Sequence, residues 1–321
     1  MAGFIALCYL GILVSSASGI VSSPFWPQPQ EYSLGTATLV IDPNFSFKLN
    51  QQSEFLNQAI QRYEHLISSS ASSSSFSTDQ VLTSCTVNVL TVHEDEYSTL
   101  QMDVDESYSL TITEDATCEI SAPTVWGCLH AFETFTQLLL RDVNGPVYTT
   151  YGPVSVTDNS RFTHRGVLID TSRHYLPVDA LKSFIETLPM NKFNVLHWHM
   201  VDAQSFPVDT PSAPEIVKGA YSPSHIYSMS DVEMLTQYAA DRGVRILPEI
   251  DIPGHAASWK NGYPEIMADC FEKYYYNINN FALDPSKDET YNVVDKVLSD
   301  IIAAVTDKHV HLGGDEVVYG W

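Results

Sequence analysis

Apolar runs alternate with stretches of helical spacing in the part of the chain that follows Asp158. The runs occupy residues 166–169, 195–200, 244–250 and 309–312. The helical stretches between them occupy residues 178–188, 231–242 and 291–305. Such alternation is typical of βα units that build a parallel sheet. We therefore predict an α/β catalytic domain over residues 159–321, formed by the first half of a TIM-type (β/α)8 barrel.

Residues 20–158 carry a different pattern, that of a smaller α+β domain. Strands are predicted where β-branched and apolar residues gather, over residues 37–41, 86–92, 108–113 and 117–121. Helices are predicted from the spacing of apolar residues over 54–67 and 125–140. The chain is thus expected to be an N-terminal α+β domain followed by a partial barrel.

The second helix of the barrel region carries its own start signal. Ser230 is followed three residues later by Glu233. This is the spacing of a capping box, in which serine and acid each accept a backbone N–H of the other. We predict that Ser230 is the N-cap.

The N-terminus has the pattern of an export signal. An apolar stretch of about a dozen residues is followed by small residues, which predicts a signal peptide over residues 1–19. It is shorter than the ~20 residues that span a bilayer, and no later segment is long and apolar enough to do so. The mature protein is expected to be soluble and either secreted or lysosomal, with a glycosylation sequon at Asn44.

Four cysteines remain once Cys8 leaves with the signal peptide, and they allow three pairings in an oxidising compartment. Cys85 and Cys118 lie in strand-like segments with polar neighbours, whereas Cys128 lies on an apolar helical pattern. We favour a Cys85–Cys118 disulfide and a buried, unpaired Cys128. Cys270 is then left over.

Acidic residues outnumber basic ones by 39 to 16, which gives a net charge of −23. Such a surface repels phosphate backbones and anionic lipid, so we expect no nucleic-acid partner. Because many carboxylates are protonated near pH 4 to 5, the charge also suits an acidic compartment. The net charge is also explained by an acidic surface that is simply exposed to solvent.

Side chains that could take part in catalysis follow each of the four apolar runs. In a (β/α)8 barrel the active site lies at the C-terminal ends of the strands. The residues with suitable side chains at these ends are Asp170, Arg173, His197, His199, Asp202, Glu249, Asp251, His255, Asp315 and Glu316. Taken singly, an acid after a strand is often a helix N-cap, and a lone histidine such as His174 is usually packed and hydrogen-bonded. Because such side chains follow all four apolar runs, an active site at the strand ends is favoured.

The adjacent acids Asp315 and Glu316 follow two glycines, Gly313 and Gly314. Glycines at this place form a tight turn where φ must be positive. They would also allow a substrate to approach the backbone closely, and the two acids that follow favour this interpretation.

Four blocks of sequence together resemble glycoside hydrolase family 20, most closely the β-N-acetylhexosaminidases of the eukaryotic lysosomal type. They are residues 161–177, 191–202, 247–255 and 311–316, in the order in which that family has them. Residues 122–127 and 133–138 resemble its N-terminal domain. The resemblance implies removal of terminal non-reducing N-acetyl-β-D-hexosamine from glycans, with retention of configuration and without a cofactor or metal.

The family mechanism that is implied gives the two acids separate roles. The 2-acetamido oxygen of the substrate attacks the anomeric carbon, in place of a protein nucleophile. Glu316 is implied as the general acid and then base, and it needs a pKa raised by burial. Asp315 is implied to hold and polarise the acetamido group.

Further positions are implied by the same blocks. Arg165 matches an arginine that grips sugar hydroxyls, while Asp202 and His255 match a pair that supports the acid. Weaker candidates are Glu249, His199 and Asp170, which would contact these groups without touching the substrate. The expected partner is a glycan that ends in N-acetylhexosamine, and the sequence leaves open whether the protein is a homodimer.

Ala203 stands where many family members have a second acid after Asp202, and the family's barrel strands five to eight have no counterpart before Trp321. We therefore expect little activity if the chain truly ends there. A truncated, non-catalytic hexosaminidase-like protein is the first alternative. A metal-dependent hydrolase is the second, because His197, His199, Asp202, His255, His309 and His311 offer metal ligands.

Overall fold

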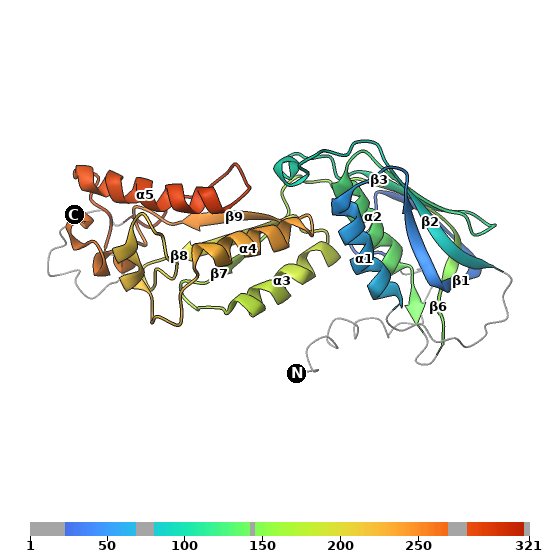
Figure 1. Cartoon of the computed structure of the whole chain (residues 1–321), viewed down its shortest axis with the longest axis horizontal. Helices are drawn as coiled ribbons and strands as arrows, with labels where there is room; N and C mark the ends of the chain where they lie inside the picture. The colour runs from blue at the N-terminus through green and yellow to red at the C-terminus, as the bar shows by residue number, and fades with distance from the viewer. Residues whose placement is uncertain (1–22, 69–79, 142–144, 269–280, 318–321) are drawn as a thin grey trace.

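The computed structural model describes residues 23–68, 80–141, 145–268 and 281–317. The predicted signal peptide, Cys270 and Trp321 lie outside these residues. Two domains follow one another along the long axis of the molecule, an α+β domain and a half-barrel, as predicted (Figure 1).

The first domain is built on a six-stranded mixed sheet with the order β1-β2-β4-β3-β6-β5. The strands are β1 (Glu31–Leu49), β2 (Val81–Val89), β3 (Tyr108–Ile112), β4 (Cys118–Ala122), β5 (Leu140–Arg141) and β6 (Val147–Asp158). The first half of β1 pairs with β6 and its second half with β2, so the sheet curls back on itself. This double pairing makes β1 much longer than the predicted strand at 37–41.

Helices α1 (Glu54–Ser68) and α2 (Val125–Gln137) cover one face of this sheet, toward the second domain (Figure 1). Thr124 caps α2 by accepting the N–H of Gly127. A disulfide joins Cys85 to Cys118, which face each other on β2 and β4, and Cys128 is buried and unpaired on α2. The core of this domain therefore lies between the sheet and the two helices.

The second domain has a three-stranded parallel sheet in the order β7-β8-β9. Its strands are β7 (Gly166–Asp170), β8 (Val195–Val201) and β9 (Arg245–Ile250). They are flanked by α3 (Val178–Met190), α4 (Met229–Ala240) and α5 (Asp288–Ala304). Short 3₁₀ helices η3 (Pro214–Gly219), η4 (Ala257–Asn261) and η5 (Pro264–Ile266) lie near the C-terminal ends of the strands. Three of the four predicted strands are present in the described residues with helices between them, and the fold class, an α+β domain followed by part of a barrel, is confirmed.

Two details of the prediction are corrected. The fourth run does not form a strand in the described residues: it makes a single parallel bridge, His311 to Glu249, at the edge of β9. The N-cap of α4 is Ser228, whose capping box is closed by Asp231, and not Ser230. The fourth run therefore falls short of a strand, and the capping box lies two residues earlier than predicted.

Buried polar contacts join the two domains. Glu106 of the first domain pairs with Arg165, which precedes β7, at 2.7 Å. The same carboxylate accepts from Asn194 Nδ2 at 3.1 Å and lies 3.3 Å from His130 Nε2. Burial lowers the pKa of His130, so Arg165 supplies the permanent positive charge. Burial of Glu106 opposes its ionisation, but its partners outweigh this effect and lower its pKa to about 2.

We expect the unfolding free energy to fall as the pH drops from about 4.5 toward 2, with Glu106 contributing roughly 3 kcal/mol. A carboxyl group with a depressed folded pKa stabilises the fold above its unfolded pKa, and this stability is lost as the pH falls through the folded pKa. Urea unfolding of the wild type and of Glu106→Gln at several pH values measures the effect. Equal pH dependence for both proteins would contradict it.

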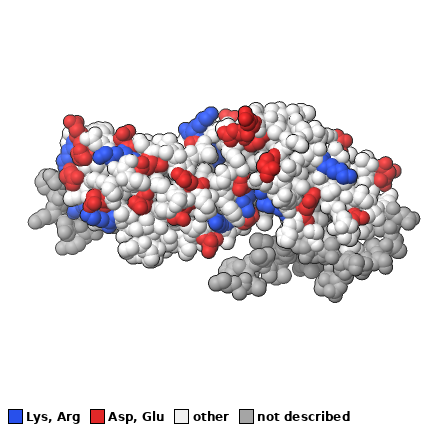
Figure 2. All heavy atoms as spheres, in the orientation of Figure 1, with Lys and Arg blue, Asp and Glu red and all other residues white. Residues whose placement is uncertain are grey.

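The surface is acidic over both domains. Figure 2 shows Asp and Glu side chains scattered over one face of the molecule, with fewer Lys and Arg among them. Asn44 of the sequon is exposed on β1. None of the helices within the described ranges combines the length and apolar character that a membrane crossing requires.

Candidate active site

The parallel register of the small sheet brings the candidate side chains to one edge. Asp170 pairs with His199, and His199 pairs with Glu249, across β7, β8 and β9. The bridge from Glu249 to His311 then places the segment that carries Asp315 next to β9. Residues that lie far apart in the sequence therefore meet at the C-terminal ends of the strands.

Asp202 is the centre of this edge and is fully buried. Its Oδ2 lies 2.8 Å from His199 Nε2 and 2.8 Å from a guanidinium nitrogen of Arg173. Its Oδ1 lies 3.2 Å from His255 Nδ1 and accepts the N–H of Ala203. Burial alone would raise the pKa of Asp202, but these donors and charges outweigh it, so that its pKa is lowered. Asp202 is therefore a buried carboxylate that orients three neighbouring side chains.

His199 lies between two carboxylates. Its Nε2 faces Asp202, and its Nδ1 lies 2.8 Å from Glu249 Oε2. Because carboxylates only accept, both ring nitrogens carry protons. Burial opposes this charge, but the two acids raise the pKa of His199 to about 10. The pKa of Glu249 is held well below its usual value by the hydrogen bonds of His197 and His199, despite its burial.

His255 connects Asp202 to Glu316. Its Nδ1 faces Asp202, and its Nε2 lies 3.3 Å from Glu316 Oε2 and 3.9 Å from Asp251 Oδ2. The 3.3 Å contact is an ion pair and not a well-directed hydrogen bond. The backbone of His255 has φ of +52°, an uncommon conformation for a residue with a side chain. The loop after β9 thus holds this ring between a buried and an exposed carboxylate.

Gly313 is required by a close approach to Asp251. A Cβ on Gly313 would lie 1.8 Å from Asp251 Oδ1, and its φ is +65°. Asp251 Oδ1 also accepts the N–H of Gly314 at 3.3 Å. Gly314 has φ of +95°, with open space around the position of a Cβ. The substrate approach that the sequence suggested for both glycines therefore fits Gly314, while Gly313 serves the packing of Asp251.

Asp315 and Glu316 are both exposed, and 64% of the Glu316 side chain is accessible to solvent. The expectation that burial surrounds Glu316 is therefore wrong for this structure. The reason is local: the segment after the His311 bridge is not part of a strand, so no neighbouring strand covers it within the described residues. The contact with His255 is what fixes the position of the carboxylate.

Arg165 does not belong to this edge, contrary to the role that the sequence implied. It lies at the N-terminal end of β7, where it pairs with Glu106 and donates to the carbonyl oxygens of Lys192 and Phe162. The arginine at the site is Arg173, which follows β7 and pairs with Asp170 at 2.7 Å and with Asp202 at 2.8 Å. The rule that selected the acids, position after a strand, also selects Arg173, whereas the resemblance implied the sugar-gripping role for Arg165.

Asp170 has a positioning role at the same turn. Its Oδ1 accepts the N–H groups of Ser172 and Arg173, and its Oδ2 pairs with the Arg173 guanidinium. Two carboxylates therefore fix the Arg173 guanidinium at the rim of the site, with 39% of its side chain exposed.

Replacing Asp202 with asparagine is expected to lower the unfolding free energy by about 2 kcal/mol. The amide would remove the negative charge that His199 and Arg173 share and turn a donor toward them. Urea denaturation measures the change. Asp209→Asn is the matched control, because Asp209 is exposed in the same loop. Equal stability of the two variants would contradict this account.

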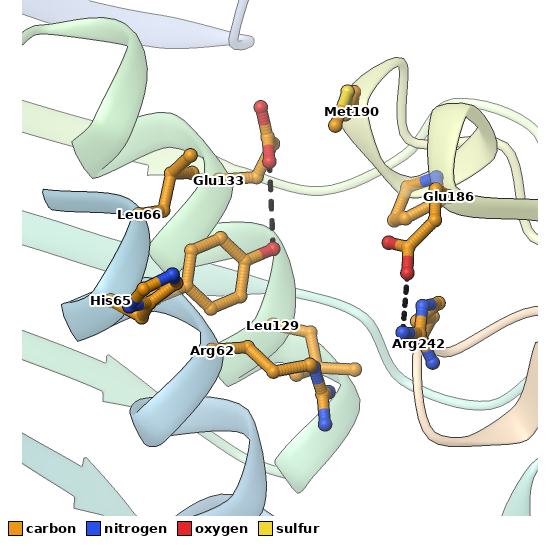
Figure 3. A pocket seen from close by; sticks show the side chains of 10 residues that line it. Arg62, His65, Leu66, Leu129, Glu133, Glu186, Met190 and Arg242 are labelled. Carbon is orange, nitrogen blue, oxygen red and sulfur yellow. Dashed lines mark hydrogen bonds and ion pairs between the residues drawn. The ribbon is translucent and has the colours of Figure 1, made fainter. Parts of the chain in front are cut away.

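A cavity of about 340 Å³ lies between the domains, at the opposite end of the strands from Asp315. Figure 3 shows Glu133 on one side and Glu186 paired with Arg242 on the other. The Tyr63 hydroxyl donates to Glu133 at 3.5 Å. Burial raises the pKa values of Tyr63 and Glu133. These acids face separate partners across the domain boundary, so the cavity does not offer the paired carboxylates found at the strand ends.

The imidazoles of the metal-hydrolase alternative are divided among three places. His199 and His255 contact Asp202, while His197 and His311 contact Glu249. His309 pairs with Asp307, away from both acids. A single catalytic centre that uses all of them is therefore not formed by the described residues.

Two family models match the chain. Residues 162–321 match the catalytic domain of glycosyl hydrolase family 20, and residues 25–138 match the domain described as beta-acetyl hexosaminidase like. The chain belongs to glycosyl hydrolase family 20. The family 20 catalytic match includes the whole strand edge described above, from Asp170 to Glu316.

Similar proteins cover both domains of this family 20 chain. It is 36% identical to beta-hexosaminidase subunit A1 of Dictyostelium discoideum over 98% of the chain, and 35% identical to beta-hexosaminidase subunit alpha of Rattus norvegicus over 96%. The chain spans 58% and 60% of the length of these two relatives.

Solved structures agree with the fold. The chitobiase of Flavobacterium johnsoniae has a TM-score of 0.76 and 27% identity, over 91% of this chain and 45% of its own. The Streptomyces plicatus N-acetyl-beta-hexosaminidase in complex with Thio-NAglucal has a TM-score of 0.72 and 25% identity, over 91% of this chain and 59% of its own.

Proposed function

We propose that this family 20 chain hydrolyses terminal non-reducing N-acetyl-β-D-hexosamine from glycans by a retaining, substrate-assisted mechanism. The observation that carries the proposal is the series Asp202–His255–Glu316, in which a buried carboxylate and a histidine hold an exposed acid at the strand ends. Exposed beside Glu316 is a second acid, Asp315.

Each residue at the strand ends has a separate role in the reaction. Glu316 protonates the leaving glycosidic oxygen while the acetamido oxygen of the substrate forms a bond to the anomeric carbon. Asp315 accepts the acetamido N–H and stabilises the positive charge that develops there. Glu316 then takes a proton from the water that opens the cyclic intermediate, which restores the acid. Arg173, fixed by Asp170 and Asp202, presents donors to sugar hydroxyls.

The test compares two aryl glycosides with the same leaving group. An aryl N-acetyl-β-glucosaminide carries the internal nucleophile, and an aryl β-glucoside lacks it. We expect turnover of the first only, on any form of the chain that hydrolyses either substrate. Equal turnover of both substrates would overturn the substrate-assisted mechanism.

A non-catalytic, sugar-binding role is the second candidate. It is favoured by the exposure of Glu316. This role predicts calorimetric binding of N-acetylglucosamine, weakened by Arg173→Gln, without turnover of the aryl substrate.

We further propose that the protein is exported, to the medium or to a lysosome. The apolar N-terminus, the Cys85–Cys118 disulfide and the exposed Asn44 sequon support this. Asn44→Gln is expected to abolish a glycosidase-sensitive mass shift of the secreted protein, and light scattering would show whether that protein is a homodimer.

A further inference from the structure

Two histidines from different segments meet on one carboxylate beside the catalytic segment. His197 Nε2 lies 2.6 Å from Glu249 Oε2, and His311 Nδ1 lies 3.0 Å from Glu249 Oε1. The two rings lie 4.8 Å apart between centroids. The ligand atoms of all three residues lie within 4.8 Å of one another. We propose that His197, Glu249 and His311 bind a divalent transition metal ion of the zinc class.

The donor set matches such an ion. Two imidazole nitrogens and one carboxylate are ligands that zinc uses when a fourth position stays open to water. Imidazole selects zinc, copper and nickel over magnesium and calcium, which prefer oxygen alone. The two other groups of acids and histidines at this edge share Asp202, Asp251 or His255 with the candidate active site. The Glu249 cluster includes none of those three residues, and His199 links Glu249 to Asp202.

A hydrogen-bond conflict points to a cation at the same place. His311 Nδ1 accepts the backbone N–H of Gly313 at 3.0 Å, so this nitrogen presents a lone pair. The same nitrogen faces Glu249 Oε1 at 3.0 Å, and a carboxylate oxygen also presents lone pairs. Two acceptors at this distance repel each other unless they share a positive charge, either a proton on the ring or a metal ion. A metal ion ligated by both His311 and Glu249 removes the repulsion in place of the proton.

The surroundings suit a metal site. Glu249 is held from behind by His199 Nδ1 at 2.8 Å, as a ligating carboxylate usually is. The His311 side chain is 46% exposed and that of His197 is 19% exposed, so an ion can enter from solvent and keep a water molecule.

The ion would act on the catalytic segment. A metal bound to His311 Nδ1 takes the lone pair that now accepts from Gly313, and this contact anchors the turn leading to Asp315 and Glu316. We therefore expect zinc to inhibit hydrolysis, an effect that rests on the proposed function, whereas the binding itself does not.

Cobalt(II) is the probe for binding. One equivalent bound to the 321-residue chain is expected to give the intense visible absorption of a four- or five-coordinate ion, and zinc should displace it. His197→Gln and His311→Gln are each expected to weaken binding by at least about tenfold. His93→Gln is the matched control, because His93 is exposed in the first domain. Far-ultraviolet circular dichroism and thermal unfolding show that each variant is folded.

Binding by both folded variants with wild-type affinity would overturn the site. So would the weak absorption of six-coordinate cobalt in the wild type, a result that needs no variant. In a form of the chain that hydrolyses the aryl substrate, full activity with zinc bound at this site would overturn the inhibitory role. A chain that binds cobalt as expected but shows no turnover leaves the site standing and contradicts the proposed function.

Discussion

Glu316→Gln is expected to lower kcat for an aryl N-acetyl-β-glucosaminide by about 10²- to 10⁴-fold, with little change in KM. Glutamine has the shape of glutamate but cannot transfer a proton to the leaving oxygen. In this variant His255, which lies 3.3 Å from the Glu316 carboxylate in the wild type, faces a neutral amide in place of the acid. Steady-state kinetics measure the loss.

The leaving group provides an internal check. A dinitrophenyl leaving group departs without protonation, so its glycoside is expected to lose much less of kcat/KM in Glu316→Gln than a phenyl glycoside. Glu233→Gln is the matched control, because Glu233 is exposed on α4. Turnover of the phenyl substrate that survives Glu316→Gln would show that another residue is the acid.

Arg165→Met is expected to lower the unfolding free energy by about 3 to 5 kcal/mol and to leave KM unchanged. The variant leaves the buried Glu106 carboxylate without its permanent counter-charge at the domain boundary. Methionine keeps much of the aliphatic volume, so the change reports mainly on the lost charge. Guanidinium denaturation gives the stability, and the aryl substrate gives KM.

Two comparisons make the Arg165 result specific. Arg161→Met changes an arginine just upstream that stacks on Phe162, and it should cost little. The double variant Arg165→Met with Glu106→Gln should be more stable than the sum of the single effects predicts, because no charge is then left unpaired. A rise in KM without loss of stability would restore a sugar-gripping role to Arg165.

Much of the fold was predictable because it is encoded locally. The helical spacing of α1 and α5 and the apolar runs of β7, β8 and β9 each report which side of an element faces the core. The Cys85–Cys118 pairing followed from polar-flanked strands, against the apolar helix that carries Cys128. The fold class therefore followed from patterns within single elements.

The sequence prediction was wrong where two local patterns competed for one helix start, or where pairing with a neighbouring strand set the length of a strand. Ser228 with Asp231 and Ser230 with Glu233 both have capping-box spacing, and the structure uses the first pair. The run at His311 has the composition of a strand, yet it makes only one bridge. A strand's length depends on its neighbours, and these are not recorded in the strand's own residues.

The sequence by itself determined which chemical groups lie at the strand ends, because the position of each strand along the chain and the type of each side chain are local properties. It did not show which carboxylates Arg165, before β7, and Arg173, after β7, would contact. Tertiary structure decided this by placing Glu106 at one end of β7 and Asp202 at the other. The charge of an arginine is fixed by its type, but its function depends on the carboxylate that the fold brings to it.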